Sequence, residues 1–290
     1  MAVYEIRYKP WEGELVPAKL RWLSIPKYSL LAVSSKGLGW SIFGAGTLQL
    51  LCYTVFLIVV NNPVLMALVK APVGSNISPD RLMRGFMFVQ TFFCLGPLVM
   101  AAPKLIAPEL QHNALSILYA RPITKLGYYF GKFITLAGIL SFLTWFQGLL
   151  LFVVMYVSYP DTHEFHTAFA ATAWPLLKGV MIHGIAITLV FSSIGICTSA
   201  MTKNSNFAGG LLMMTLFGSS FVGAFLGKQL SDSLLAIGIW SSLQQIGENV
   251  FAGNDPKLSL GAALGGAIFW IVVPTLIALW RLRPVDVHKD

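Results

Sequence analysis

The sequence predicts an all-α integral membrane protein with six transmembrane helices. Hydrophobic residues make up 56% of its 290 residues and charged residues only 11%, whereas a soluble domain carries about 25% charged residues. The mean hydropathy is +0.71. A helix needs about 20 apolar residues to cross a bilayer. Six stretches meet this need, and they are residues 38–60, 86–106, 133–157, 176–201, 207–226 and 260–280.

Three parts are expected along the chain. Residues 1–37 form a basic cytoplasmic tail with a helix in the membrane interface, residues 38–280 form the six-span domain, and residues 281–290 form a second cytoplasmic tail. The interfacial helix would be built on Leu20, Trp22, Leu23, Leu30 and Leu31. A solvated tail with one anchoring side chain is the alternative. No cleavable signal peptide is expected, because the residues before the first apolar run are polar and mixed.

A mildly apolar stretch, residues 233–253, lies between the last two spans. It carries Glu248 with Gln244 and Gln245 nearby. A charged residue at the centre of a span costs about 2.5–3.5 kcal/mol. We therefore expect an outer interfacial or re-entrant helix here rather than a seventh span.

The distribution of Lys and Arg predicts the orientation. With the N-terminus inside, 14 of the 20 Lys and Arg residues fall in inner segments. Both termini and residues 109–132 are therefore expected in the cytoplasm. The net charge of +8 is explained by this bias, so it does not indicate a nucleic-acid partner.

One long polar stretch, residues 109–132, interrupts the apolar middle of the chain. We expect a short amphipathic helix at about residues 108–121, with Pro108 at its first position and Glu109 in its first turn. Pro122 would end this helix at Arg121. Its apolar stripe has helical spacing and consists of Leu110, Ala114, Ile117 and Leu118. Such a helix either lies on the membrane or binds a partner protein.

Sites for cofactors or catalysis are not expected in this chain. The segments 127–132 and 223–228 resemble phosphate-binding loops, but each is one residue short and lacks Ser or Thr after its Lys. His163 and His166 stand three apart in an expected outer loop without an evident third metal ligand. The spans contain no Ser/His/Asp set or carboxylate pair. The three cysteines, Cys52, Cys94 and Cys197, show neither disulfide nor metal spacing.

Several polar residues fall within the predicted spans. The candidates for a translocation path are Gln49, Gln90, Gln147, His183 and Ser193. The alternative is that these side chains form hydrogen bonds between neighbouring helices. The sequence leaves both interpretations open.

Residues 109–132 also carry a family resemblance. The stretch resembles the segment after the second span in the membrane subunit of a type-2 ABC transporter, the six-span permease of bacterial exporters. The matching residues are Glu109, Ala114, Leu115, Leu118, Arg121, Pro122, Ile123, Thr124, Lys125, Gly131 and Lys132. His112 and Asn113 depart from the pattern, where relatives carry a charged residue and Gly.

The resemblance implies that this chain is the membrane subunit and that a separate subunit hydrolyses ATP. The cytoplasmic helix would be a coupling helix that docks on a separate ATPase subunit, which would bind the ATP and magnesium. Leu110, Ala114, Ile117, Leu118 and Tyr119 would enter a groove of that subunit, and Glu109, Arg121 and Lys125 would make contacts at its rim. A second permease copy or paralogue, export, and residence in the bacterial inner membrane are further implications.

Two other classes of function remain open. A partner-independent secondary transporter or channel would need ionisable residues at mid-membrane, where His183 is almost the only candidate. An intramembrane enzyme would need a metal or nucleophile at His163, His166 or His183. The substrate is not predicted.

Overall fold

The computed structural model describes residues 22–34, 38–61, 78–119, 123–158, 163–251 and 256–282. This part of the chain is helical throughout and contains no strand. The predicted all-α class is therefore confirmed. The helices are α1 Ser24–Ser34, α2 Leu38–Asn61, α4 Pro79–Phe93, α5 Leu95–Ala101, α6 Pro103–Gln111, α7 Ala114–Tyr119, α8 Lys125–Ser141, η2 Phe142–Phe146, α9 Gln147–Ser158, α10 His163–Met201, α11 Ser205–Gln229, η3 Asp232–Ile237, α12 Ile239–Val250 and α13 Leu260–Arg281.

Five continuous helical stretches are long and apolar enough to cross a membrane. They are Pro79–Gln111, Lys125–Ser158, Ala173–Met201, Ser205–Gln229 and Leu260–Arg281. Helix α2 has 24 residues, which at about 1.5 Å per residue exceeds a hydrocarbon core of about 30 Å. Each of the six stretches contains one of the apolar runs expected from the sequence.

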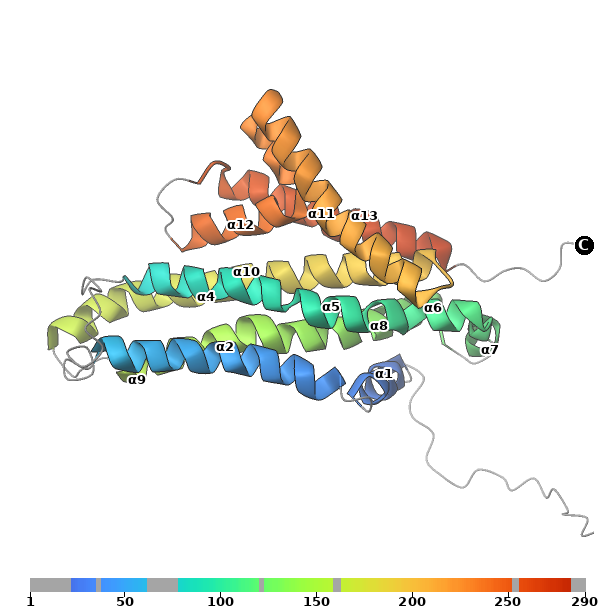
Figure 1. Cartoon of the computed structure of the whole chain (residues 1–290), viewed down its shortest axis with the longest axis horizontal. Coiled ribbons are helices and arrows are strands. Elements are labelled where there is room, and N and C mark those ends of the chain that lie inside the picture. The colour runs from blue at the N-terminus through green and yellow to red at the C-terminus, as the bar shows by residue number, and fades with distance from the viewer. Residues whose placement is uncertain are drawn as a thin grey trace, which may run out of the picture.

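The bundle is built around α10, whose apolar part is largely buried. Figure 1 shows α2, α4, α8, α9 and α10 along the long axis of the molecule, and α10 packs against α4, α8 and α9. Small residues let neighbouring helices approach α10 closely. A Cβ at Gly184 would lie 3.0 Å from the backbone N of Trp145, so this crossing requires glycine.

One end of the bundle collects segments from across the sequence. Figure 1 places α1, α7 and the end of α13 at this end, with α1 lying crosswise to the bundle. The helix expected in the N-terminal segment is present as α1. Its Leu30 and Leu31 are exposed, while Ser29 is buried. Leu20 lies outside the described residues.

Helix α11 leaves the bundle at a steep angle (Figure 1). It exposes a stripe of large apolar side chains at helical spacing, consisting of Phe207, Met214, Phe217, Phe221 and Phe225. Apolar surface of this kind suits contact with lipid or with another membrane helix.

The stretch 233–253 folds as η3 and α12. Helix α12 has 12 residues, about 18 Å, which is too short to cross the bilayer. Arg84 on α4 donates to Glu248 on α12, with Nη1 and Oε2 2.5 Å apart. The charge that argued against a seventh span is therefore paired.

The helix predicted around residue 108 differs from the structure in its bounds and its continuity. The helix expected at about residues 108–121 is two helices, because α6 ends at Gln111 and α7 begins at Ala114. Asn113 between them has a φ of 52°, a conformation that Asn tolerates better than most residues. Pro108 is not the first helical residue but lies inside α6, which begins at Pro103. Because α6 continues the second membrane helix, it begins before Pro108.

The other differences concern helix lengths and regularity. His163 and His166 belong to α10 rather than to a loop, and their side chains lie outside the described residues. The second membrane helix has breaks at Cys94 and Ala102, where Pro97 and Pro103 remove backbone donors. The third contains the π-helical turn η2, which no sequence pattern predicted.

Candidate functional site

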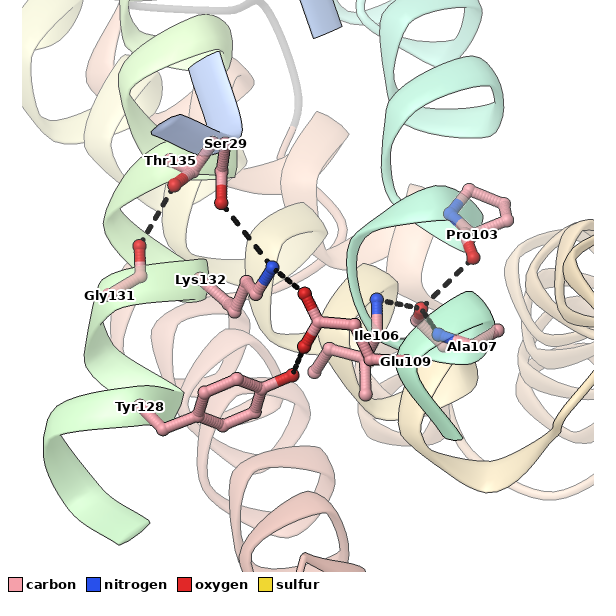
Figure 2. Close-up of polar contacts among 10 residues, drawn as sticks. Ser29, Pro103, Ile106, Ala107, Glu109, Tyr128, Gly131, Lys132 and Thr135 are labelled. Carbon is pink, nitrogen blue, oxygen red and sulfur yellow. Dashed lines mark hydrogen bonds and ion pairs between the residues drawn. The ribbon is translucent and has the colours of Figure 1, made fainter. Parts of the chain in front are cut away.

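An ion pair joins the end of α6 to α8. The Nζ of Lys132 lies 2.6 Å from Oε1 of Glu109, and the hydroxyl of Tyr128 donates to Oε2 of the same carboxylate. Lys132 also donates to Oγ of Ser29 on α1, at 3.3 Å. Figure 2 shows Glu109 between Lys132 and Tyr128. Three helices, α1, α6 and α8, thus meet at one carboxylate and one ammonium group.

The sequence of helix α8 places the side chains of Tyr128 and Lys132 beside Glu109. Thr124 caps its N-terminus by accepting a hydrogen bond from the N–H of Gly127, at 3.1 Å. Tyr128 and Lys132 are four residues apart, so they share one helix face. Between them, Gly131 lies against Ile25 of α1, where a Cβ would come within 2.8 Å of the Ile25 Cβ. The Gly-Lys pair therefore has a physical reason: glycine admits α1, and lysine reaches the carboxylate.

A serine fixes the other side of α6. The hydroxyl of Ser199 on α10 accepts from the N–H groups of Ile106 and Ala107, at 3.0 and 3.1 Å, and donates to the carbonyl of Pro103, at 3.2 Å. Figure 2 labels these three partners on α6. Ser199 is fully buried, so these hydrogen bonds are shielded from water. Helix α6 is held between α10 and α8.

The ion pair is only partly shielded from solvent. The Lys132 side chain is 8% exposed and that of Glu109 is 28% exposed. Removing one partner of a buried pair costs about 3–5 kcal/mol, and an exposed pair contributes about 0–1 kcal/mol. We place the contribution of this pair between those limits, at about 1–3 kcal/mol.

The structure revises which residues of this segment are open to a partner. Both carboxylate oxygens of Glu109 are bonded within the chain, and its role as a rim contact stays a prediction. Leu110, Leu115 and Leu118 are partly buried and pack against the protein's own core. Among the side chains described between residues 108 and 119, those of Gln111, His112 and Asn113 are exposed.

The remaining predicted residues of the segment divide into two groups. Ala114 and Lys125 are half-buried. Arg121 and Pro122 lie outside the described residues, as do the side chains of Ile117 and Tyr119. The turn at residues 112–113 divides the predicted stripe between α6 and α7, and its role in binding a partner stays a prediction.

The polar residues of the spans mostly bind neighbouring helices. Gln90 on α4 donates to the carbonyl of Leu143 and to Oε1 of Gln147, the latter at 3.1 Å. Gln49 on α2 donates to the carbonyl of Phe86 at 3.0 Å. Ser193 bonds within its own helix, to the carbonyl of Leu189. All four side chains are buried, which favours the helix-contact interpretation over a translocation path.

His183 lies apart from these four residues. It is buried between α10 and α12, and its ring packs edge-on against Phe251.

The segments that resemble phosphate loops are helical, residues 127–132 in α8 and 223–228 in α11. Their backbone N–H groups are therefore used within helices. Within the described residues, no group of three His, Cys, Asp or Glu side chains could hold a metal ion. The described cysteines are all free.

The sequence model of a known family, described as ABC-2 family transporter protein, matches residues 41–287. This match spans most of the chain and includes α6, α7 and α8. The chain belongs to the ABC-2 transporter family. A comparison with curated proteins gave no match.

Membership in the ABC-2 family agrees with the multi-pass membrane architecture. It also makes the chain a membrane component of an ABC transporter system. The family match begins after α1, yet in this ABC-2 protein α1 is bonded to the Glu109–Lys132 pair through Ser29.

Proposed function

We propose that this ABC-2 protein is the permease subunit of an ATP-driven exporter. It works with a separate ATPase subunit, which binds ATP and magnesium, and with a second permease copy or paralogue. The membrane is the bacterial inner membrane, with both termini in the cytoplasm. The Lys and Arg bias and the family match support this proposal.

The observation that carries the proposal is the attachment of α6. The exposed turn at residues 111–113 stands at the end of this helix. The partly buried Glu109–Lys132 pair ties the helix to α8 and, through Lys132, to Ser29 of α1, and the buried Ser199 ties it to α10. A force applied at the turn would therefore act on three helices together. A segment that only rested on lipid would not need such bonds.

In this mechanism the ATPase subunit contacts the turn, and closure of the ATPase on ATP displaces it. Glu109 passes the displacement to Lys132 and α8, while Ser199 passes it to α10, the helix at the centre of the bundle. Rigid packed elements transmit displacement because protein interiors are close-packed. The membrane helices then change which side of the membrane the substrate pathway faces.

Co-purification and ATPase assays test the proposal. The full chain, co-expressed with its ABC ATPase subunit, should form a complex in which ATP hydrolysis depends on the permease. The double variant Gln111→Glu with His112→Glu adds charge at the exposed turn and should abolish that dependence. Lys257→Glu serves as a matched control, because Lys257 is exposed just before α13 begins, at the opposite end of the bundle.

Two results would overturn this function. One is normal permease-dependent ATP hydrolysis in the double variant. The other is transport by the purified chain alone in liposomes, driven by an ion gradient, which would make it a partner-independent transporter.

A further inference from the structure

A small notch opens between α4, α10 and α12, away from the Glu109–Lys132 pair. It is lined by Phe88, Thr91, His183, Trp240, Leu243 and Gln244. Its internal volume is about 10 Å³, at the lower limit of what a cavity needs to hold one water molecule. The notch is therefore large enough for one oxygen-bearing group and too small for a ring.

His183 lines the notch and is 3% exposed. The backbone of Leu243 approaches the imidazole, but neither ring nitrogen has a partner at hydrogen-bond geometry among the described residues. Leaving a buried polar group unpaired costs about 1–3 kcal/mol. The ring cannot easily turn to find another partner, because it lies against Gly247, where a Cβ would come within 3.1 Å of its Cε1.

The hydrogen-bonding groups around the notch define what can enter it. A neutral imidazole has one N–H donor and one nitrogen acceptor. Thr91 donates its hydroxyl proton to the carbonyl of Met87, at 2.8 Å, so its oxygen faces other groups as an acceptor. A group that both donates and accepts matches this set. A hydroxyl does so, while a metal ion would need more ligands than the described residues provide here.

The rim of the notch is aromatic. Phe88 and Trp240 line it, and Phe92 packs beside both, with its ring centroid 5.2 Å from that of Phe88 and 4.1 Å from that of Trp240. Phe88 and Phe92 are 38% and 44% exposed. An apolar body attached to the hydroxyl could therefore rest on these rings outside the notch. Water offers the same hydroxyl chemistry without the apolar body.

We propose that this notch is a binding site for one hydroxyl group, held by His183 and Thr91, which is supplied either by water or by the hydroxyl end of an amphiphile. The site lies on three helices that the Glu109–Lys132 pair does not join directly. It does not depend on ATP coupling, so it can be tested on the purified chain alone.

High-resolution structures of the full chain in phosphatidylcholine nanodiscs test the site, with and without added 1-naphthol. The variants are Thr91→Val, which removes one partner, and Thr135→Val, its matched control. Thr135 is also buried and bonds the carbonyl four residues earlier, at 2.9 Å from Gly131, but it does not line the notch. We expect density within hydrogen-bond distance of His183 and Thr91 in the wild type and in Thr135→Val, and its loss in Thr91→Val.

The two sources give different densities. An isolated peak in both samples identifies water, whereas density that continues over Phe88 and Trp240 with 1-naphthol identifies an amphiphile. In the second case a 1-naphthol titration, followed by the ring ¹⁵N signals of His183, should show about threefold to tenfold weaker binding in Thr91→Val than in Thr135→Val.

Thermal unfolding of both valine variants shows that they are folded. An empty notch in the wild type in both samples would overturn the proposal. So would a bond from each ring nitrogen of His183 to a protein group, or a peak that persists in Thr91→Val.

Discussion

Replacing Lys132 by methionine removes the cation beside Glu109 and keeps an unbranched side chain of similar length. The lost contact is the 2.6 Å pair between Nζ and Oε1. Glu109 would keep the hydroxyl of Tyr128, but its charge would lack a counterion. Since the carboxylate is 28% exposed, water recovers part of the loss. We expect the free energy of unfolding to fall by about 1–3 kcal/mol.

A double-mutant cycle measures the pair itself. Lys132→Met, Glu109→Gln and the double variant are unfolded in detergent with increasing dodecyl sulfate, and their free energies of unfolding are compared. The double variant should lose less than the sum of the two single variants, with a coupling free energy of about 1–2 kcal/mol. The same variants are then reconstituted with the ATPase subunit, and permease-dependent ATP hydrolysis is measured.

The ion pair between Arg84 and Glu248 is a matched control at another place in the fold. Its Nη1 and Oε2 atoms are 2.5 Å apart and both side chains are 25% exposed. Arg84→Met should destabilise the protein to a similar degree but leave ATPase coupling per folded molecule unchanged. A coupling free energy near zero for Glu109 and Lys132 would refute the structural reasoning. Equal loss of ATPase coupling in both pairs would refute the assigned role of Glu109.

Three further predictions concern single positions. Ser199→Ala should lower the free energy of unfolding by about 1–3 kcal/mol because three bonds to α6 are lost. Ser193→Ala loses one bond within its own helix and should lower the free energy of unfolding by less. Equal effects of the two variants would argue against a stabilising contact between Ser199 and α6. Gly131→Ala should lower the free energy of unfolding by about 1–3 kcal/mol, because the added methyl group would be overpacked against α1. Gly138→Ala lies on the same helix, where the added methyl group meets open space, and it should be neutral or stabilising in the same unfolding assay. Gln90→Met should lower the melting temperature, because it removes the hydrogen bond to the carbonyl of Leu143, and it should leave transport per folded molecule unchanged. Lost transport at normal stability would instead indicate that Gln90 lines the translocation path.

The sequence predicted the segment 109–132 in outline and missed its internal contacts. The apolar spacing correctly indicated helix around Leu110 and Leu118, but Pro108 does not begin that helix. The break at Asn113 was not foreseen, because a single Asn with positive φ leaves no periodic signal. Glu109 was interpreted as a surface contact because nothing in a linear sequence shows that Lys132, 23 residues later, folds back onto it.

The polar residues of the spans illustrate the same limit. Gln49, Gln90 and Gln147 were recognisable as unusual in apolar helices, and both bonding between helices and pathway lining remained open. Only the packing of α2, α4 and α9 shows that these amides bond across helices. Ser199 gave no signal at all, since serine is common in membrane helices and its three partners come from one distant helix.

The sequence alone determined the all-α membrane class, the number of apolar segments and the special character of residues 109–132. These properties follow from hydropathy, helix length and charge bias, which act locally or sum along the chain. Only the tertiary structure decided that Glu109 bonds to Lys132 and Tyr128, that residues 111–113 form an exposed turn, and that His183 faces a notch. Each of these depends on side chains from distant segments meeting at hydrogen-bond distance, which packing of the helices alone determines.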